Sequence, residues 1–125
     1  MIAHKLSRTA LTFALLLFPV TIAVSCRSYH VAITVENRTG APIQILEVDY
    51  PSASFGADAL AAGANFHYRI QVQGSGPVKV QYTGPGGHQE QITGPTLSER
   101  EQGSLQIVLQ PNGKAEFFPQ LTPGH

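Results

Sequence analysis

Apolar and polar side chains alternate through most of the chain after Arg27, and this alternation limits the possible fold more than any other feature. Its clearest stretch places polar residues between Phe66, Tyr68, Ile70 and Val72. A period of two directs neighbouring side chains to opposite faces of a β-strand, whereas an amphipathic helix requires a period near 3.6. No segment after Arg27 sustains the helical period, so the sequence predicts an all-β domain.

The alternating pattern divides into about seven strands, separated by residues that favour turns. The strands are predicted around Val31–Val35, Ile43–Tyr50, Phe66–Val72, Val78–Tyr82, His88–Thr93, Leu105–Leu109 and Ala115–Phe118. Turn residues fill Asn37–Pro42, and hairpins are predicted at Gly74–Pro77 and at Pro111–Lys114. Strands spaced by roughly 8–12 residues are typical of a small antiparallel β-sandwich.

Three segments depart from the simple pattern. The apolar parity changes between Ile45 and Leu46, which predicts a β-bulge or a strand covered on both faces. The segment His88–Thr93 is more polar than the other strands and is therefore predicted to be an edge strand. The alternation breaks in Ala53–Gly63, where one helical turn around Ala59–Ala62 is predicted.

The first part of the chain has the features of an export signal. Lys5 and Arg8 precede an uncharged, mostly apolar run from Ala10 to Val24. This run would form a helix of only ~22 Å, shorter than the ~30 Å hydrocarbon core of a bilayer, and Pro19 would interrupt its hydrogen bonds. A cleaved signal is the favoured interpretation, and an uncleaved anchor stays open as the alternative.

The apolar run ends in Ala23-Val24-Ser25-Cys26, which resembles the lipobox of bacterial lipoprotein precursors. The resemblance implies cleavage between Ser25 and Cys26 and acylation of Cys26, with Arg27 in a position that favours the outer membrane. An ordinary signal peptide, cleaved near the same small residues, is the alternative. The predicted division is a signal peptide at 1–25, a lipidated cysteine and tether at 26–30, a β-sandwich at 31–120 and a tail at 121–125.

Part of the predicted sandwich resembles bacterial immunoglobulin-like exported modules. The resemblance rests on two patterns, Val35-x-Asn37-x-Thr39-Gly40-x-Pro42-Ile43 and Leu60-x-x-Gly63 leading into Phe66-x-Tyr68-x-Ile70. It implies two sheets in a Greek-key arrangement. It also implies a role in adhesion, spacing or interaction without catalysis.

The charge balance argues against nucleic acid as a partner. The 125 residues carry 8 basic and 8 acidic side chains. Removal of residues 1–25 takes away Lys5 and Arg8 and leaves a net charge of −2. Such a domain has no basic surface to neutralise a phosphate backbone. Cys26 is the only cysteine, so neither an internal disulfide nor a thiolate metal cluster can form.

Two groups of residues are candidates for a binding surface. His67 and Arg69 share the outward face of the best predicted strand and could bind a carbohydrate or an acidic group, although a solvated face is the simpler interpretation. Tyr50 and Phe55 belong to the irregular segment Tyr50–Gly56, which could be a recognition loop. Alternatively, both aromatic rings fold back to cover one end of the core.

No pattern indicates catalysis, and neither a cofactor nor a metal ion is predicted. His88 and Glu90 could hold a divalent metal only if His30 or His67 supplied a further ligand. The sequence therefore predicts a lipid-anchored, noncatalytic module, attached to the bacterial cell membrane or outer membrane and facing the periplasm or exterior. Its partner would be the membrane and another envelope protein, and its small-molecule ligand, if any, is unknown. The alternatives are an accessory subunit that pairs through an edge strand and a small metal-dependent hydrolase.

Overall fold

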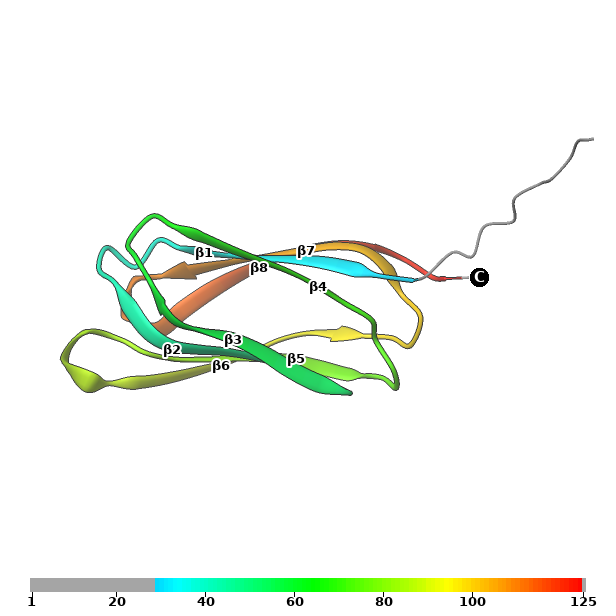
Figure 1. Ribbon diagram of the computed structural model, residues 1–125, viewed down its shortest axis with the longest axis horizontal. Helices are drawn as coiled ribbons and strands as arrows, with labels where there is room; N and C mark the ends of the chain where they lie inside the picture. Colours follow the sequence, from blue (N-terminus) through cyan, green and yellow to red (C-terminus); the bar gives the residue numbers. More distant parts are fainter. Residues whose placement is uncertain (1–28, 125) are drawn as a thin grey trace, which may run out of the picture.

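The computed structural model describes residues 29–124. The predicted signal peptide, Ser25, Cys26 and His125 lie outside these residues. The described chain forms eight strands, joined at two places by short 3₁₀ turns, η2 (Pro85–Gly87) and η3 (Pro111–Gly113) (Figure 1). The strands are β1 (Val31–Asn37), β2 (Ile43–Tyr50), β3 (Ala53–Leu60), β4 (Asn65–Ile70), β5 (Gly76–Thr83), β6 (Gln89–Leu97), β7 (Gln102–Gln110) and β8 (Lys114–Thr122).

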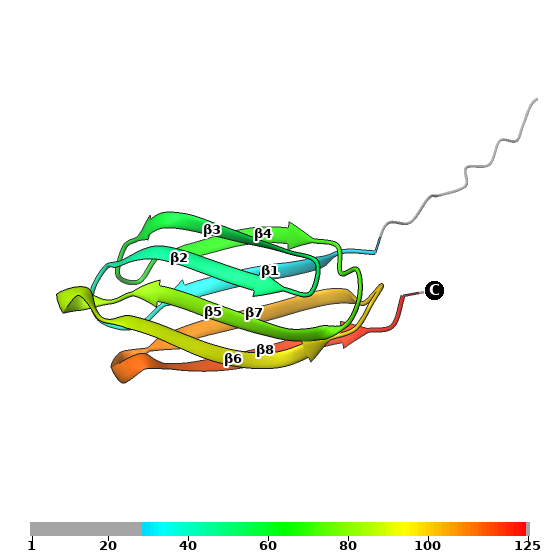
Figure 2. The same cartoon turned by 90° about the horizontal axis from the view of Figure 1, so that it is seen from below.

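The strands form two sheets of four that pack face to face (Figures 1 and 2). Sheet A has the order β4-β1-β7-β8, and sheet B has the order β3-β2-β5-β6. All pairs are antiparallel except β1 with β7, which run parallel from Val31 opposite Gly103 to Asn37 opposite Leu109. The predicted all-β sandwich is confirmed. The parallel pair and the eighth strand are additions to the prediction.

The core lies between the sheets and follows directly from the alternation. Sheet A contributes Val31, Ile33 and Val35, and sheet B contributes Val78 and Val80, all with at most 1% of their surface exposed. β-branched side chains suit a strand because their restricted rotamers pack well against the pleated surface. Burying each such side chain stabilises the fold by about 1.5–3 kcal/mol.

The predicted irregularity in the second strand is a β-bulge. The pairing of β2 with β5 shifts between Gln44 and Glu47. Ile45 adopts a φ of 51° at this point and leaves 66% of its surface exposed. Because the bulge adds one residue, Ile43 and Leu46 can both point into the core.

The helical turn predicted within Ala53–Gly63 is wrong, because β3 occupies most of this segment. β3 pairs with β2 from Tyr50 opposite Ala53 to Ile43 opposite Leu60. The sheet satisfies the backbone hydrogen bonds and buries Phe55 and Leu60, which outweighs the helix propensity of alanine.

The hairpin predicted at Gly74–Pro77 is also wrong. β4 belongs to sheet A and β5 to sheet B, so the chain crosses between the layers here. Val72 lies in this link with only 3% of its surface exposed, and its carbonyl accepts a hydrogen bond from the Arg100 amide at 3.1 Å. Burial of Val72 at the end of the core explains why the alternating pattern continues past the end of β4 at Ile70.

Two further local predictions agree with the structure. β6 lies at the edge of sheet B, and η3 joins β7 to β8 in a hairpin with Asn112 at a φ of 68°. β8 continues to Thr122, two residues beyond the predicted end of the domain. In the part of the chain that the structure describes, no helix has the length and hydropathy needed to cross a membrane.

Candidate functional site

The edges of β3 and β4 lie together on one side of the sandwich, and the edges of β6 and β8 lie together on the other (Figure 2). We call the surface between β3 and β4 the open side. Three aromatic residues gather there around Phe55. Its ring centroid is 4.6 Å from that of Tyr68, 6.0 Å from that of Phe66 and 6.3 Å from that of Tyr50. The Phe55 and Tyr68 rings are inclined by only 18°, so they stack face to face.

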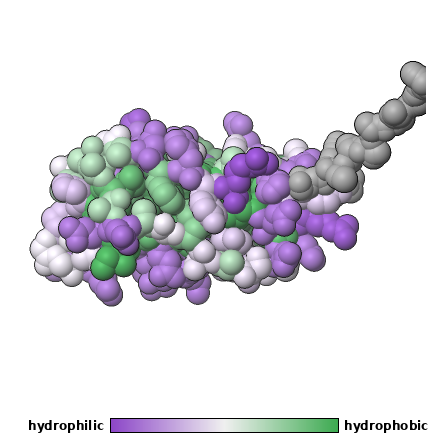
Figure 3. Space-filling view, viewed as in Figure 1, coloured by the Kyte–Doolittle hydropathy of each residue, from purple (hydrophilic) through white to green (hydrophobic). Residues whose placement is uncertain are grey.

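Tyr68 is the exposed member of this aromatic group. Its position in β4 alternates with His67 and Arg69, so its side chain projects from the inner face of sheet A. It nevertheless has 47% of its surface exposed, because sheet A ends at β4 and no further strand covers the ring. Figure 3 views the molecule from this side and shows hydrophobic surface between more polar regions.

The opposite side of the sandwich is closed by tight packing. Gly94 of β6 lies against the ring of Phe117 of β8, and a Cβ atom at Gly94 would come within 2.5–2.8 Å of three ring atoms. Glycine therefore permits the two edge strands to approach closely. On the β3–β4 side, by contrast, the inward-facing ring of Tyr68 is exposed to solvent.

Two shallow pockets, each of about 470 Å³, lie beside β4 and share Tyr68 and Arg69, and the second is on the outward face of sheet A. The first also contains His30, Tyr50, Ser52 and Gln73, among others. The second also contains Ala32, Thr34 and His67. Neither pocket has a carboxylate among its lining residues. Their chemistry is therefore aromatic, basic and rich in hydrogen-bonding groups.

Of the two groups of candidate residues, the structure brings Tyr50 and Arg69 into one pocket and leaves His67 and Phe55 outside it. His67 and Arg69 are exposed on the outward face of β4, and His67 Nδ1 lies 3.0 Å from Thr34 Oγ1 of the neighbouring β1. Tyr50 ends β2 and is half-buried against the core. Phe55 lies within β3 with 7% of its surface exposed.

The prediction that Tyr50–Gly56 is irregular is wrong. The segment consists of the end of β2, a tight turn and the start of β3. Only Pro51 and Ser52 lie between β2 and β3. The Ser52 hydroxyl accepts a hydrogen bond from the Gln73 amide at 3.4 Å, which ties this turn to the link after β4. The turn therefore forms one end of the first pocket rather than a long recognition loop.

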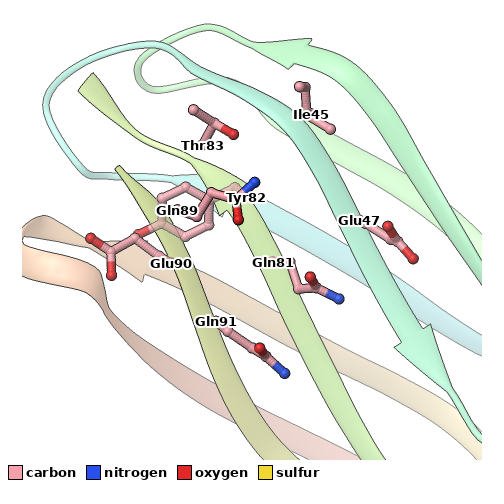
Figure 4. A pocket seen from close by; sticks show the side chains of 8 residues that line it. All are labelled: Ile45, Glu47, Gln81, Tyr82, Thr83, Gln89, Glu90 and Gln91. Carbon is pink, nitrogen blue, oxygen red and sulfur yellow. The ribbon is translucent and has the colours of Figure 1, made fainter. Parts of the chain in front are cut away.

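A third pocket, of about 280 Å³, lies beside the bulge of β2 on sheet B (Figure 4). It is lined by Ile45, Glu47, Gln81, Tyr82, Thr83, Gln89, Glu90 and Gln91. A hydrogen bond to Asp49 and the negative charge of that residue raise the pKa of Glu47 above its ordinary value. Burial, and secondarily the charge of Glu90, raises the pKa of Tyr82. This pocket offers amides and carboxylates, which suit hydrogen bonding to a neutral polar molecule.

The metal site considered from the sequence is not assembled. Among residues 29–124, no three His, Cys, Asp or Glu side chains lie close enough to hold a metal ion together. His88 precedes β6, and Glu90 lies opposite Tyr82 in the β5–β6 pair. His67 belongs to the outward face of the other sheet, which is why sequence spacing cannot complete the ligand set.

Sequence reasoning did not identify Tyr68 as a surface residue, because its alternation with His67 and Arg69 only shows that it faces inward. Its exposure depends on β4 being an edge strand. The pocket at the bulge was also missed, although the parity change at Ile45 and Leu46 marks its position.

The structure is similar to an NMR structure of a protein from Eubacterium rectale, with a TM-score of 0.55 and 15% sequence identity. The similarity covers 78% of this chain and 96% of the other chain. No protein-family model matches the sequence, and no curated protein matches it. At this identity the likeness shows the fold alone. Fold and geometry together define a small β-sandwich whose open side is aromatic, with basic residues beside β4 and the acidic Asp58 on β3.

Proposed function

We propose that this chain is an exported, lipid-anchored binding module of the bacterial cell envelope that performs no catalysis. The observation that carries the proposal is the position of Cys26, directly after the run Ala10–Val24 and shortly before the start of β1 at Val31. Acylation at this position would attach the folded domain to a membrane without a spanning helix, and two or three acyl chains make such attachment stable.

The arrangement of the domain supports this proposal. The described chain starts at the end of the sandwich where β8 also finishes (Figure 1). From Cys26 to Val31 the chain can extend at most about 18 Å. The end that contains the Pro51–Ser52 turn would therefore stay close to the lipid headgroups.

The open side supports a binding role for the anchored domain. Tyr68, stacked on Phe55, exposes aromatic surface there near Arg69 and His67, and continuous apolar surface with a polar rim is typical of interaction sites. In the second pocket Thr34 Oγ1 lies 3.0 Å from His67 Nδ1, but no carboxylate lines this pocket to orient the imidazole, so the arrangement favours binding over catalysis.

Metabolic labelling with palmitate tests the anchor. The wild-type chain should incorporate the label and sediment with membranes, and Cys26→Ser should do neither. The matched control is the double variant Cys26→Ser, Ser28→Cys, in which the thiol is moved by two positions. This variant should remain unlabelled. An intact Met1 terminus with an unmodified Cys26 in the wild-type protein, measured by mass spectrometry, would overturn the proposal.

A further inference from the structure

We propose that the free edge of β4 binds an extended, acidic segment of a partner protein, which adds as a fifth strand to sheet A. This inference rests on the proposed binding function and names the class of partner. It follows from the backbone of β4, from the exposed aromatic surface beside it and from the charge of the surrounding pockets.

The backbone of β4 is suited to strand addition. β4 pairs regularly with β1 from Asn65 opposite Glu36 to Ile70 opposite Val31. It is the last strand of sheet A, and no backbone hydrogen bond outside this pairing involves Asn65–Ile70 within the described chain. In an antiparallel pair, alternate residues direct their N–H and C=O groups away from the partner. Those groups of β4 therefore face outward, ready to pair with another strand.

The other edge strands carry features that hinder such pairing. β6 contains Pro95 and a register shift, β8 contains Pro119, and β3 contains Asp58, which would repel an acidic strand, whereas β4 contains Arg69. Proline cannot donate a backbone hydrogen bond, and a bulge turns an edge away from another strand. β4 contains no proline, no glycine and no bulge. It is thus the edge that remains most open to a new strand.

A fifth strand would bury aromatic surface that is now exposed to solvent. Tyr68 projects from the inner face of sheet A but has 47% of its surface exposed, stacked on Phe55 of sheet B. A strand added beside β4 would direct alternate side chains toward these rings and cover them. Burial of apolar surface contributes roughly 25 cal/mol per Å², which supplements the backbone hydrogen bonds.

The basic residues beside β4 favour an acidic partner. Arg69 lines both pockets, with His30 in one and His67 in the other, and no acidic residue lines either. In the described residues, the only ion pair joins Arg38 to Glu36 at 2.6 Å. Glu36 of the neighbouring β1 also accepts a hydrogen bond from Gln106, so this carboxylate is already engaged. A glutamate or aspartate on the incoming strand would give Arg69 a charged partner.

Peptide binding to the full-length chain in detergent micelles tests the proposal. The probe is a synthetic eight-residue peptide that alternates glutamate with valine, and the reference is the same peptide with lysine in place of glutamate. The acidic peptide should bind at least about tenfold more tightly, with slowed hydrogen exchange at alternate amides of β4. Methylation of the peptide's backbone nitrogens along one edge should abolish binding, because it removes the donors that pair with β4.

Charge reversal provides the matched control. Arg69→Glu, an exposed substitution, should invert the preference so that the lysine peptide binds better. Lys79→Glu, on the outward face of β5, should leave the preference unchanged. Failure of both peptides to bind, or binding that backbone methylation does not weaken, would overturn the inference. Neither result affects palmitate labelling of Cys26, so failure of this inference is distinguishable from failure of the anchor.

Discussion

Asn37 is the one buried polar side chain in the part of the chain that the structure describes, and it connects three segments. Its Nδ2 donates to the carbonyls of Ala41 and Leu60 at 2.9 and 3.0 Å. Its Oδ1 accepts from the amide and the hydroxyl of Thr39 at 3.0 and 2.7 Å. The side chain therefore fixes the β1–β2 turn against the end of β3 and satisfies backbone groups that have lost water.

Replacement of Asn37 should be among the most damaging single changes. Asn37→Leu keeps a similar volume but leaves buried carbonyl and amide groups without partners, so the free energy of unfolding should fall by about 2–4 kcal/mol. Urea denaturation followed by circular dichroism measures this change. Gln44→Ala, at an exposed position of β2, should cost less than about 0.5 kcal/mol. An equally small loss for Asn37→Leu would show that the network does not stabilise the fold.

At the scale of the elements, the two sides of the sandwich differ in how their edge strands meet. β6 and β8 come together because Gly94 makes room for the ring of Phe117. β3 and β4 meet through aromatic rings, and Tyr68 remains half exposed. The close approach of β6 and β8 requires glycine at position 94, whereas the contact between β3 and β4 is made by the large rings of Phe55 and Tyr68.

The packing of β6 on β8 can be tested by filling the space at Gly94. Gly94→Ala should destabilise the protein by about 1–3 kcal/mol, because its Cβ atom would displace the Phe117 ring. The same substitution made in a Phe117→Ala background should cost markedly less. Equilibrium unfolding of the wild type, both single variants and the double variant measures this coupling. Strictly additive losses would contradict the proposed contact.

At the scale of the whole molecule, the sandwich is assembled from strands that are distant in the sequence. The parallel pairing places Val31 beside Gly103, and β1 sits in the middle of sheet A between β4 and β7. The first strand can therefore be fixed in its sheet only after β7 has been brought to it. Closing such a long loop costs entropy before the contacts form.

This topology predicts slow folding for a chain of its size. The major refolding phase should occur in milliseconds to seconds, as in other β-sandwiches dominated by nonlocal pairs. Stopped-flow dilution from urea, with tyrosine fluorescence as the signal, measures the rate. A major phase completed in microseconds would show that local contacts, rather than the β1–β7 pairing, limit folding.

Local patterns determined the strands and their inner faces, because side-chain periodicity depends only on neighbours along the chain. The bulge at Ile45 and the hairpin at Pro111 were predictable for the same reason. Tertiary structure decided that Ala53–Leu60 is a strand, since pairing with β2 overrides helix propensity, and that the chain changes sheets after Ile70. Tertiary structure also decided where the open side lies. Phe55 stacks on Tyr68, and Tyr50 shares a pocket with Arg69, only because β3 and β4 end their sheets on the same side, and sheet order depends on contacts between distant residues.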